Sequence, residues 1–203
     1  MKKIILASAS PRRQEILKNI GLQFEILVSD ADESKIDKNA VPVSIYVQEL
    51  AMLKALAVAE KLKNKNALII AADTVVYLDG KILGKPKDES DAKNMLKALS
   101  GRCHSVFTGV CVMDAKTLKS VCANEETKVY FKELSEERID DYVRTKEPMD
   151  KAGAYAVQGL GGMLVEKTEG DFLNVIGLPA KKLFDILEKE FEFDVFKEKS
   201  DEI

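Results

Sequence analysis

The six residues Ala67-Leu68-Ile69-Ile70-Ala71-Ala72 are the longest uninterrupted apolar run in the chain. A short, wholly apolar run is typical of a strand that is buried on both of its faces. Asp73 follows this run directly. Ligands of α/β sheets gather at the carboxyl ends of strands, so the position of Asp73 predicts a functional role for its carboxylate.

Strand and helix signals alternate along the rest of the chain. Ser10 can cap a helix that starts at Pro11 and ends at Gly21, and Asp79-Gly80 predicts a two-residue hairpin. Apolar or β-branched runs predict strands at residues 3–7, 24–28, 67–72, 75–78, 81–83, 106–113, 120–131 and 163–166. Helical patterns fall at residues 11–20, 42–63, 88–100, 179–191 and from residue 135 onward.

This order of elements predicts an α/β fold with a mixed sheet, in which residues 106–113 and 120–131 form a long antiparallel pair. The chain has no internal repeat and no linker. We therefore expect a single domain over residues 1–196, followed by a charged tail, residues 197–203, that frays.

The charge of the chain is nearly balanced. Among 203 residues, 31 are basic and 34 acidic, which gives a formal net charge of −3 with the two signs interspersed. A general nucleic-acid binder needs a surplus of Lys and Arg on one face, so this class is excluded. A hydrophobic fraction of 46% also excludes collagen-like, mucin-like and broadly disordered chains.

Neither an export signal nor a membrane span is expected. The apolar stretch after Lys2-Lys3 is about four residues long, whereas a signal peptide needs ~7–15 and a membrane-spanning helix ~20 apolar residues. The three cysteines are odd in number and lack a CxxC spacing, which argues against a disulfide framework and a zinc site. We interpret them as buried small hydrophobes of a cytoplasmic protein.

A basic segment, Ser8-Ala9-Ser10-Pro11-Arg12-Arg13, joins the first predicted strand to the first predicted helix. The free N–H groups and the dipole of a helix N-terminus favour an anion. Two arginines in that first turn oppose the dipole, and a bound phosphate would reconcile the conflict. The segment therefore predicts a phosphate site; the alternative is two solvated surface arginines.

Acidic residues form a second group of candidates. Glu33 and its neighbours Asp30 and Asp32 lie in a loop after a predicted strand, so they can meet Asp73 in space. Carboxylates without imidazole or thiolate partners suit hard cations such as Mg²⁺ or Mn²⁺. Taken singly, each acid is equally at home as a turn or capping residue.

Lysines form a third group. Lys54 lies in an otherwise apolar helical stretch, Lys85 follows the hairpin, and Lys151 precedes the glycine-rich segment. Periodicity does not separate these three lysines from ordinary solvated ones.

Short motifs follow one another in a fixed order along the chain. They are Ser8-Ala9-Ser10-Pro11-Arg12-Arg13, Ala72-Asp73-Thr74, Gly84-Lys85-Pro86, Leu99-Ser100-Gly101, Thr108-Gly109, Asp150-Lys151-Ala152-Gly153-Ala154-Tyr155 and Asn174-Val175-Ile176-Gly177-Leu178-Pro179. Each motif is weak alone, but the ordered series is highly specific. Through this series the chain resembles the Maf family from residue 4 to about residue 190.

The resemblance implies a cytoplasmic nucleoside triphosphate pyrophosphatase, linked to septum formation, cell-division arrest and removal of modified or surplus nucleotides. It implies an elongated mixed sheet flanked by helices, with two lobes around a nucleotide cleft, similar to the inosine triphosphate pyrophosphatase fold. Members of the family convert a nucleoside triphosphate to the monophosphate and pyrophosphate with Mg²⁺ or Mn²⁺. The resemblance also makes a homodimer plausible.

The family motifs also imply roles for single residues. Asp73 matches the proton acceptor that activates water, and Glu33 matches an acid that assists with the metal. The set expected around the phosphates is Ser8, Arg13, Lys54, Lys85 and Lys151. The sequence leaves open whether Asp73 removes a proton or positions a metal-bound water.

Three residues match the branch of the family that acts on dTTP and UTP: Arg12, Thr74 and Gln158. Ala156-Val157 departs from the Gly-Ile more common in that branch, and an alanine restricts the backbone if φ is positive there. Two alternatives stay open at this point: the same reaction on 7-methyl-GTP or another modified nucleotide, and a non-catalytic nucleotide-binding regulator of septation.

Overall fold

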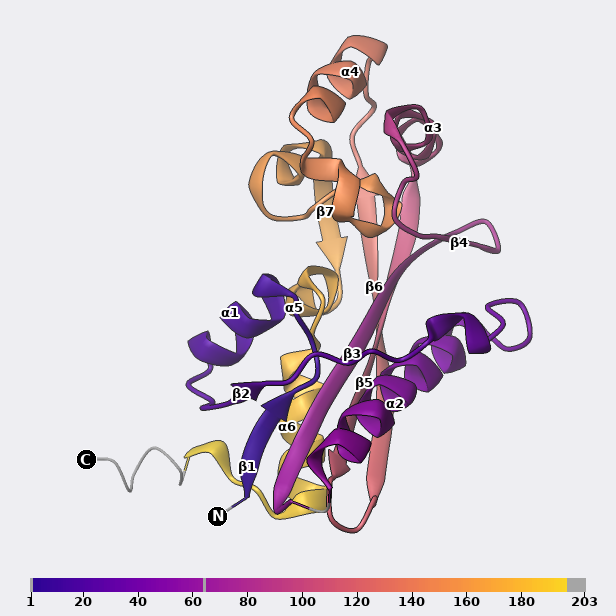
Figure 1. Cartoon of the computed structure of the whole chain (residues 1–203). Coiled ribbons are helices and arrows are strands. Elements are labelled where there is room, and N and C mark those ends of the chain that lie inside the picture. Colours follow the sequence, from indigo (N-terminus) through magenta and orange to yellow (C-terminus); the bar gives the residue numbers. More distant parts are fainter. Residues whose placement is uncertain (1, 64, 197–203) are drawn as a thin grey trace. The chain divides into compact units, whose positions relative to one another are not determined.

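Strands and helices alternate along the chain in the predicted order (Figure 1). The computed structural model describes residues 2–63 and 65–196, so the expected frayed tail, residues 197–203, lies outside the described residues. The strands are β1 (Lys3–Leu6), β2 (Glu25–Ile26), β3 (Ala67–Leu78), β4 (Lys81–Leu83), β5 (Cys103–Asp114), β6 (Ser120–Phe131) and β7 (Val165–Glu169). The α-helices are α1 (Pro11–Asn19), α2 (Val43–Leu62), α3 (Glu89–Leu99), α4 (Glu136–Arg144), α5 (Phe172–Ile176) and α6 (Ala180–Phe191).

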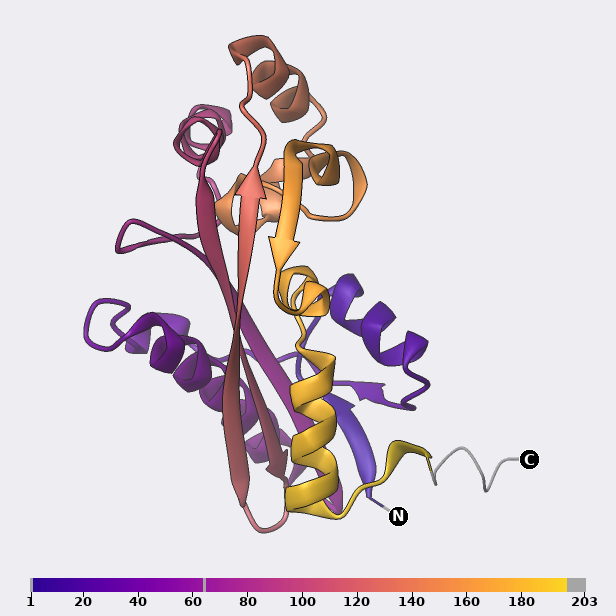
Figure 2. The same cartoon turned by 180° about the vertical axis from the view of Figure 1, so that it is seen from behind.

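The strands form one mixed seven-stranded sheet in the order β2-β1-β3-β5-β6-β7, with β4 paired to β3. β1 is parallel to both β2 and β3, whereas the pairs β3–β4 and β6–β7 are antiparallel. The arrows of β5 and β6 run in opposite directions (Figure 2). Helices flank this sheet, so the predicted α/β class with a mixed sheet is confirmed.

The described contacts divide the chain into two compact units. Unit 1 comprises Met1–Asp73, Thr108–Glu125 and Gly177–Ile203, and unit 2 comprises Thr74–Phe107 and Glu126–Ile176. The long strands β3, β5 and β6 each contribute residues to both units. The expectation of a single domain over residues 1–196 stays a prediction.

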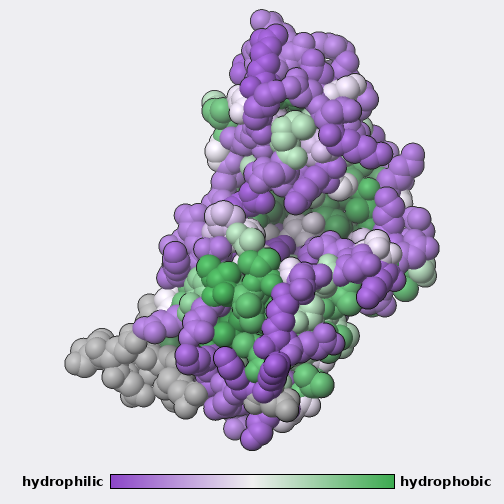
Figure 3. Space-filling view, in the orientation of Figure 1, coloured by the Kyte–Doolittle hydropathy of each residue, from purple (hydrophilic) through white to green (hydrophobic). Residues whose placement is uncertain are grey.

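The core of unit 1 forms around the first half of β3, where the apolar run from Ala67 to Ala72 is at most 3% exposed. The apolar face of α2 packs on it through small residues such as Ala51, Ala55 and Val58. Hydrophobic residues also show on the face of Figure 3 in the region of β1–β3, and Ile26 and Val28 are the half-exposed apolar side chains at β2.

The helix α2 approaches β5 at backbone distance. A Cβ atom placed at Gly109 would lie 2.1 Å from the carbonyl oxygen of Val47, the fifth residue of α2. Glycine is therefore required at this position because its neighbour is backbone, which cannot rotate away. This contact fixes where α2 and its side chains lie on the sheet.

Replacing Gly109 with alanine should lower the free energy of unfolding by at least about 2 kcal/mol, because α2 must shift to admit the methyl group. Gly84→Ala is the matched control, since a Cβ there meets nothing within 4 Å. Urea unfolding of both variants checks the expectation. Equal stability of the two variants would show that α2 moves without cost.

The core of unit 2 contains an aromatic cluster around His104, the single histidine of the chain. Its imidazole is 3% exposed, its Nε2 lies 2.8 Å from the hydroxyl of Tyr155, and both rings pack edge-on against Phe131. Burial lowers the pKa of His104 to about 4. The folded protein therefore holds this imidazole neutral.

The free energy of unfolding should decrease as the pH is lowered from 6.5 to about 4. Over this range the imidazole of His104 takes up a proton in the unfolded chain but not in the folded chain. The contribution of the neutral imidazole to stability is therefore fully present above pH 6.5 and is lost progressively below it. His104→Gln removes this titration. We expect the difference between the two unfolding free energies to change by about 3 kcal/mol between pH 7 and pH 4. Parallel pH profiles in chemical denaturation would contradict this assignment.

Most local signals act as predicted. Ser10 caps α1 by accepting a hydrogen bond from the backbone of Arg13, and Gly21 follows the helix with a φ of +77°. Asp79 and Gly80 both have positive φ and form the two-residue turn between β3 and β4. None of the helices within residues 2–63 and 65–196 is long and apolar enough to pass through a membrane.

Three expectations require correction. β3 does not end before Asp73 but continues through it to Leu78, because the second half of the strand pairs with β4. β2 spans only two residues, since its pairing with β1 covers just Glu25 and Ile26. Cys103 is exposed, so the interpretation of all three cysteines as buried is wrong, although all three are free.

Candidate active site

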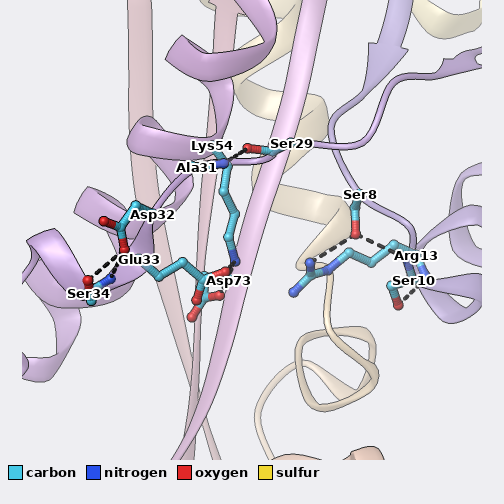
Figure 4. A network of polar contacts seen from close by, with 10 residues as sticks. All are labelled: Ser8, Ser10, Arg13, Ser29, Ala31, Asp32, Glu33, Ser34, Lys54 and Asp73. Carbon is cyan, nitrogen blue, oxygen red and sulfur yellow. Dashed lines mark hydrogen bonds and ion pairs between the residues drawn. The ribbon is translucent and has the colours of Figure 1, made fainter.

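The turn after β1 carries the basic segment in unit 1. The amide of Ala7 donates to the carbonyl of Ile70 on β3, so Ser8 is the first residue past the parallel pair. The Ser8 hydroxyl then accepts hydrogen bonds from the amide of Ser10 and from Nη1 of Arg13, both at 3.2 Å (Figure 4). Ser8 is buried, so a hydroxyl inside the protein holds both the backbone of the turn and the side chain of Arg13.

Arg13 is anchored at two places. Its Nε donates to the carbonyl oxygen of Gly177 at 2.8 Å, while Nη1 donates to Ser8. Burial lowers the pKa of Arg13, while Asp73 and Glu33 act to raise it. The guanidinium therefore stays within electrostatic range of both carboxylates. In contrast, the side chain of Arg12 has no hydrogen-bond or ion-pair partner among the described residues.

Lys54 joins the two candidate acids. Its Nζ lies 2.5 Å from Oδ1 of Asp73 and 3.0 Å from Oε1 of Glu33 (Figure 4). The side chains of Lys54 and Asp73 are only 14% and 13% exposed, whereas that of Glu33 is 53% exposed. Glu33, Lys54 and Asp73 are called the acid–lysine cluster below.

Three different elements of unit 1 supply the acid–lysine cluster. Asp73 lies three residues beyond Ile70, where the parallel pairing of β3 with β1 ends. Lys54 projects from the middle of α2. Glu33 begins the short 3₁₀ helix Glu33–Lys35, which Asp32 caps by accepting a hydrogen bond from the amide of Ser34.

The acid–lysine cluster leaves one oxygen of Asp73 unused. Oδ1 accepts from Lys54, whereas Oδ2 has no partner within the described residues. Burial, followed by the charges of Asp73 and Glu33, raises the pKa of Tyr46 on α2. The Tyr46 hydroxyl therefore lies within electrostatic range of both carboxylates, and Oδ2 of Asp73 is available to accept a hydrogen bond from water.

The next feature is whether the carboxylates of Glu33 and Asp73 suit a divalent cation. Within the residues that the structure describes, no three His, Cys, Asp or Glu side chains are grouped to hold a metal ion. Glu33 and Asp73 nevertheless reach one common cation, the ammonium of Lys54. Because Mg²⁺ is commonly held by one or two carboxylates together with substrate phosphates, the pair fits a cation that arrives with a phosphate ligand.

Lys54→Met should leave two carboxylates facing each other without a cation. We expect the variant to lose more unfolding free energy at low than at high ionic strength, because salt screens the repulsion between the two carboxylates. Urea titrations at the two salt concentrations measure this difference. Lys61→Met is the matched control on α2, because Lys61 pairs with the 73%-exposed Asp30 and such pairs contribute little. A loss of stability in Lys54→Met that does not depend on salt would contradict the repulsion.

The remaining candidates lie in unit 2. Lys85 is exposed in the loop after β4, and Gln158 is exposed in the glycine-rich segment. Lys151 is 14% exposed and pairs with Asp150. Thr74 is half-buried on β3, directly after Asp73. The structure thus brings Ser8, Arg13, Glu33, Lys54 and Asp73 together in unit 1 and places Thr74, Lys85, Lys151 and Gln158 in unit 2.

The backbone at Ala156 shows no strain. Positive φ occurs at Gly153, Ala154 and Gly159 of this segment but not at Ala156. The alanine that replaces the more common glycine is therefore accommodated without conformational cost.

Sequence reasoning missed two contributors to unit 1. Gly177 supplies the carbonyl that holds Arg13, and Tyr46 lies within electrostatic range of the two carboxylates. Gly177 lies in one of the quoted motifs, whose spacing gave no hint of a partner 164 positions away. Tyr46 carries no motif signal.

Fold and site together define an α/β protein that carries a basic turn and a carboxylate–lysine cluster within one unit. A family model described as "Maf-like protein" matches residues 3–190, almost the whole described chain. The chain belongs to the Maf-like protein family.

Curated relatives are similar over nearly their full lengths. A dTTP/UTP pyrophosphatase of Thermoanaerobacter sp. (strain X514) is 52% identical over 190 residues, 94% of this chain and 97% of that protein. A protein of the same name from Clostridium novyi (strain NT) is 54% identical, over 91% of this chain and 95% of that protein. Another from Acetivibrio thermocellus is 51% identical, over 97% of this chain and 99% of that protein.

A solved structure, a nucleoside-triphosphatase/dITP/XTP pyrophosphatase from Mycobacterium abscessus, aligns with a TM-score of 0.39 at 16% identity. The alignment covers 64% of this chain and 74% of that chain. Similarity at this level is too weak to extend the description of the fold.

Proposed function

We propose that this protein hydrolyses dTTP and UTP to the nucleoside monophosphate and pyrophosphate. The relatives that share about half of its residues carry this activity in their names. The observation that carries the proposal in this chain is the acid–lysine cluster, which occupies the same unit as the basic turn from Ser8 to Arg13. Hydrolysis of a phosphoanhydride needs charge neutralisation, an in-line water and a base rather than a covalent nucleophile.

The basic turn is assigned to phosphate binding. Arg13 is held by Gly177 and Ser8, so its remaining donors are directed rather than free to rotate. An arginine fork suits phosphate oxygens because it offers several N–H groups in one plane. Lys85 and Lys151 of unit 2 are likewise assigned to phosphate binding.

Asp73 is assigned to the water. Its Oδ2 accepts a hydrogen bond from the attacking water, whose oxygen bonds to the α-phosphorus while the bond from that phosphorus to the bridging oxygen breaks. Pyrophosphate leaves, and the water proton passes to Asp73 or to solvent. Lys54 donates to Oδ1, which leaves Oδ2 of Asp73 for the water.

A divalent cation, Mg²⁺ or Mn²⁺, is part of the proposal. Glu33 and Asp73 would hold it, and it would supply neutralisation of the phosphate charge. Lys54 neutralises the same two carboxylates in the structure.

Base preference is assigned to Arg12, Thr74 and Gln158. Arg12 and Gln158 have no side-chain partner in the described part of the chain, so both are available to a ligand. We further propose a cytoplasmic enzyme that forms a homodimer, and that residues 1–196 act as one functional domain. A role in division arrest or in clearing modified nucleotides would follow from this activity.

Incubation with dTTP, UTP, 7-methyl-GTP and dGTP in the presence of Mg²⁺ or Mn²⁺, with the products resolved by ion exchange, tests the proposal. We expect monophosphate and pyrophosphate in equal amounts from dTTP and UTP. Release of inorganic phosphate in place of pyrophosphate would refute the reaction. Preferential turnover of 7-methyl-GTP would refute the base assignment alone.

Asp73→Asn should lower kcat for dTTP by about a hundredfold or more while leaving the products unchanged, because an amide is a poor proton acceptor. Asp185→Asn on α6 is the matched control, since this exposed carboxylate forms an ion pair with Lys189 and lies outside the acid–lysine cluster. Steady-state kinetics measure both variants. Full activity of Asp73→Asn would exclude Asp73 from the reaction, and a division phenotype unaffected by that variant would favour a regulator that needs no hydrolysis.

A further inference from the structure

One carboxylate in unit 2 holds the segment that contains Gln158. Glu147 accepts hydrogen bonds through Oε1 from the amide of Gly161 at 2.9 Å and through Oε2 from the amide of Leu160 at 3.2 Å. Its Oε1 also accepts the hydroxyl proton of Tyr142 at 2.9 Å. Glu147 has no ion-pair partner within the described residues. The backbone amides of Leu160 and Gly161 and the hydroxyl of Tyr142 are therefore the groups that stabilise its charge.

Tyr142 extends the contact to the other end of the segment. Its hydroxyl accepts a hydrogen bond from the amide of Ala156 at 3.2 Å while it donates to Glu147. The phenol is 4% exposed and burial raises its pKa, so it stays neutral. Glu147 and Tyr142, called the loop clamp below, therefore hold residues on both sides of Gln158.

Glycines let the segment close tightly on the loop clamp. A Cβ at Gly161 would lie 2.4 Å from the hydroxyl of Tyr142 and 2.4 Å from the carbonyl oxygen of Ala156. A Cβ at Gly159, where φ is +77°, would lie 2.9 Å from Oε2 of Glu147. The backbone from Ala156 to Gly161 thus packs directly against the two side chains.

Gln158 itself is exposed and has no side-chain partner among the described residues. Its backbone is extended, with φ of −100° and ψ of 155°. A side chain without contacts takes its direction from its backbone alone. The order of that backbone therefore decides whether Gln158 presents its amide to a ligand in one orientation.

We propose that Glu147 is a positioning residue for base selection, which acts through Tyr142 and the backbone of residues 156–161 to orient Gln158. The inference rests on the proposed function, because it concerns discrimination between nucleotide bases. The residues assigned to the phosphates are not part of the loop clamp. Its loss therefore affects the choice of base more than hydrolysis itself.

Glu147→Gln tests the inference. The amide keeps one acceptor but places an NH₂ group against the amide of Leu160 or Gly161, so the clamp loosens. We expect the ratio of kcat/KM for dTTP to kcat/KM for dGTP to fall about tenfold, equivalent to about 1.4 kcal/mol of lost discrimination. The loss should come from dTTP, with kcat/KM for dGTP nearly unchanged. Tyr142→Phe, which removes only the bridging hydroxyl, should lower the same ratio.

A double-mutant cycle separates positioning from general destabilisation. In a Gln158→Ala background, Glu147→Gln should cause no further change in the ratio. Asp88→Asn is the control for stability, because it weakens the cap of α3 and has no bond to residues 156–161. Thermal melts of every variant confirm folding, and Tyr142→Phe carries the test if Glu147→Gln does not fold.

The outcomes are distinguishable. A wild-type protein that does not turn over dTTP refutes the proposed function and this inference with it. An active wild type whose two kcat/KM values fall by the same factor in Glu147→Gln overturns the positioning role alone. A further fall of the ratio in the Gln158→Ala background also overturns it.

Discussion

The parallel pairing of β1 with β3 is the constraint on which unit 1 depends. Its register, from Lys3↔Ala67 to Leu6↔Ile70, ends both strands' paired segments at the same edge. Ser8 and Asp73 follow at that edge, so a basic turn and a carboxylate emerge from one buried pair of strands. The apolar character of the strands thus does two things: it drives burial, and it brings opposite charges to one place.

Charge compensation in the acid–lysine cluster is the second organising interaction. Asp73 and Lys54 are both largely removed from water, and neither would be stable in that state alone. The contact between Gly109 and the backbone of Val47 holds α2 in the position from which Lys54 reaches the carboxylates. Packing at a glycine thus determines the geometry of an ion pair.

Local signals allowed most of the fold to be predicted from the sequence, because caps, turns and apolar runs act over a few residues. The boundary at Asp73 could not be predicted, since a polar residue usually ends a buried run and the strand continues through tertiary pairing, with β4 paired to its last three residues. The family resemblance pointed to Asp73 and Lys54 but not to their contact. The partners of Arg13 and Gly161, namely Gly177 and Glu147, depend on tertiary contacts that no local pattern encodes.

The division of the chain has a consequence for the order of folding during synthesis. Unit 2 is made from residues 74–107 and 126–176, whereas unit 1 also requires the segment from Gly177 onward. Every residue of unit 2 is therefore synthesised before the last segment of unit 1 exists. Since the carbonyl of Gly177 anchors Arg13, the basic turn cannot be held in its final position until synthesis has passed residue 177.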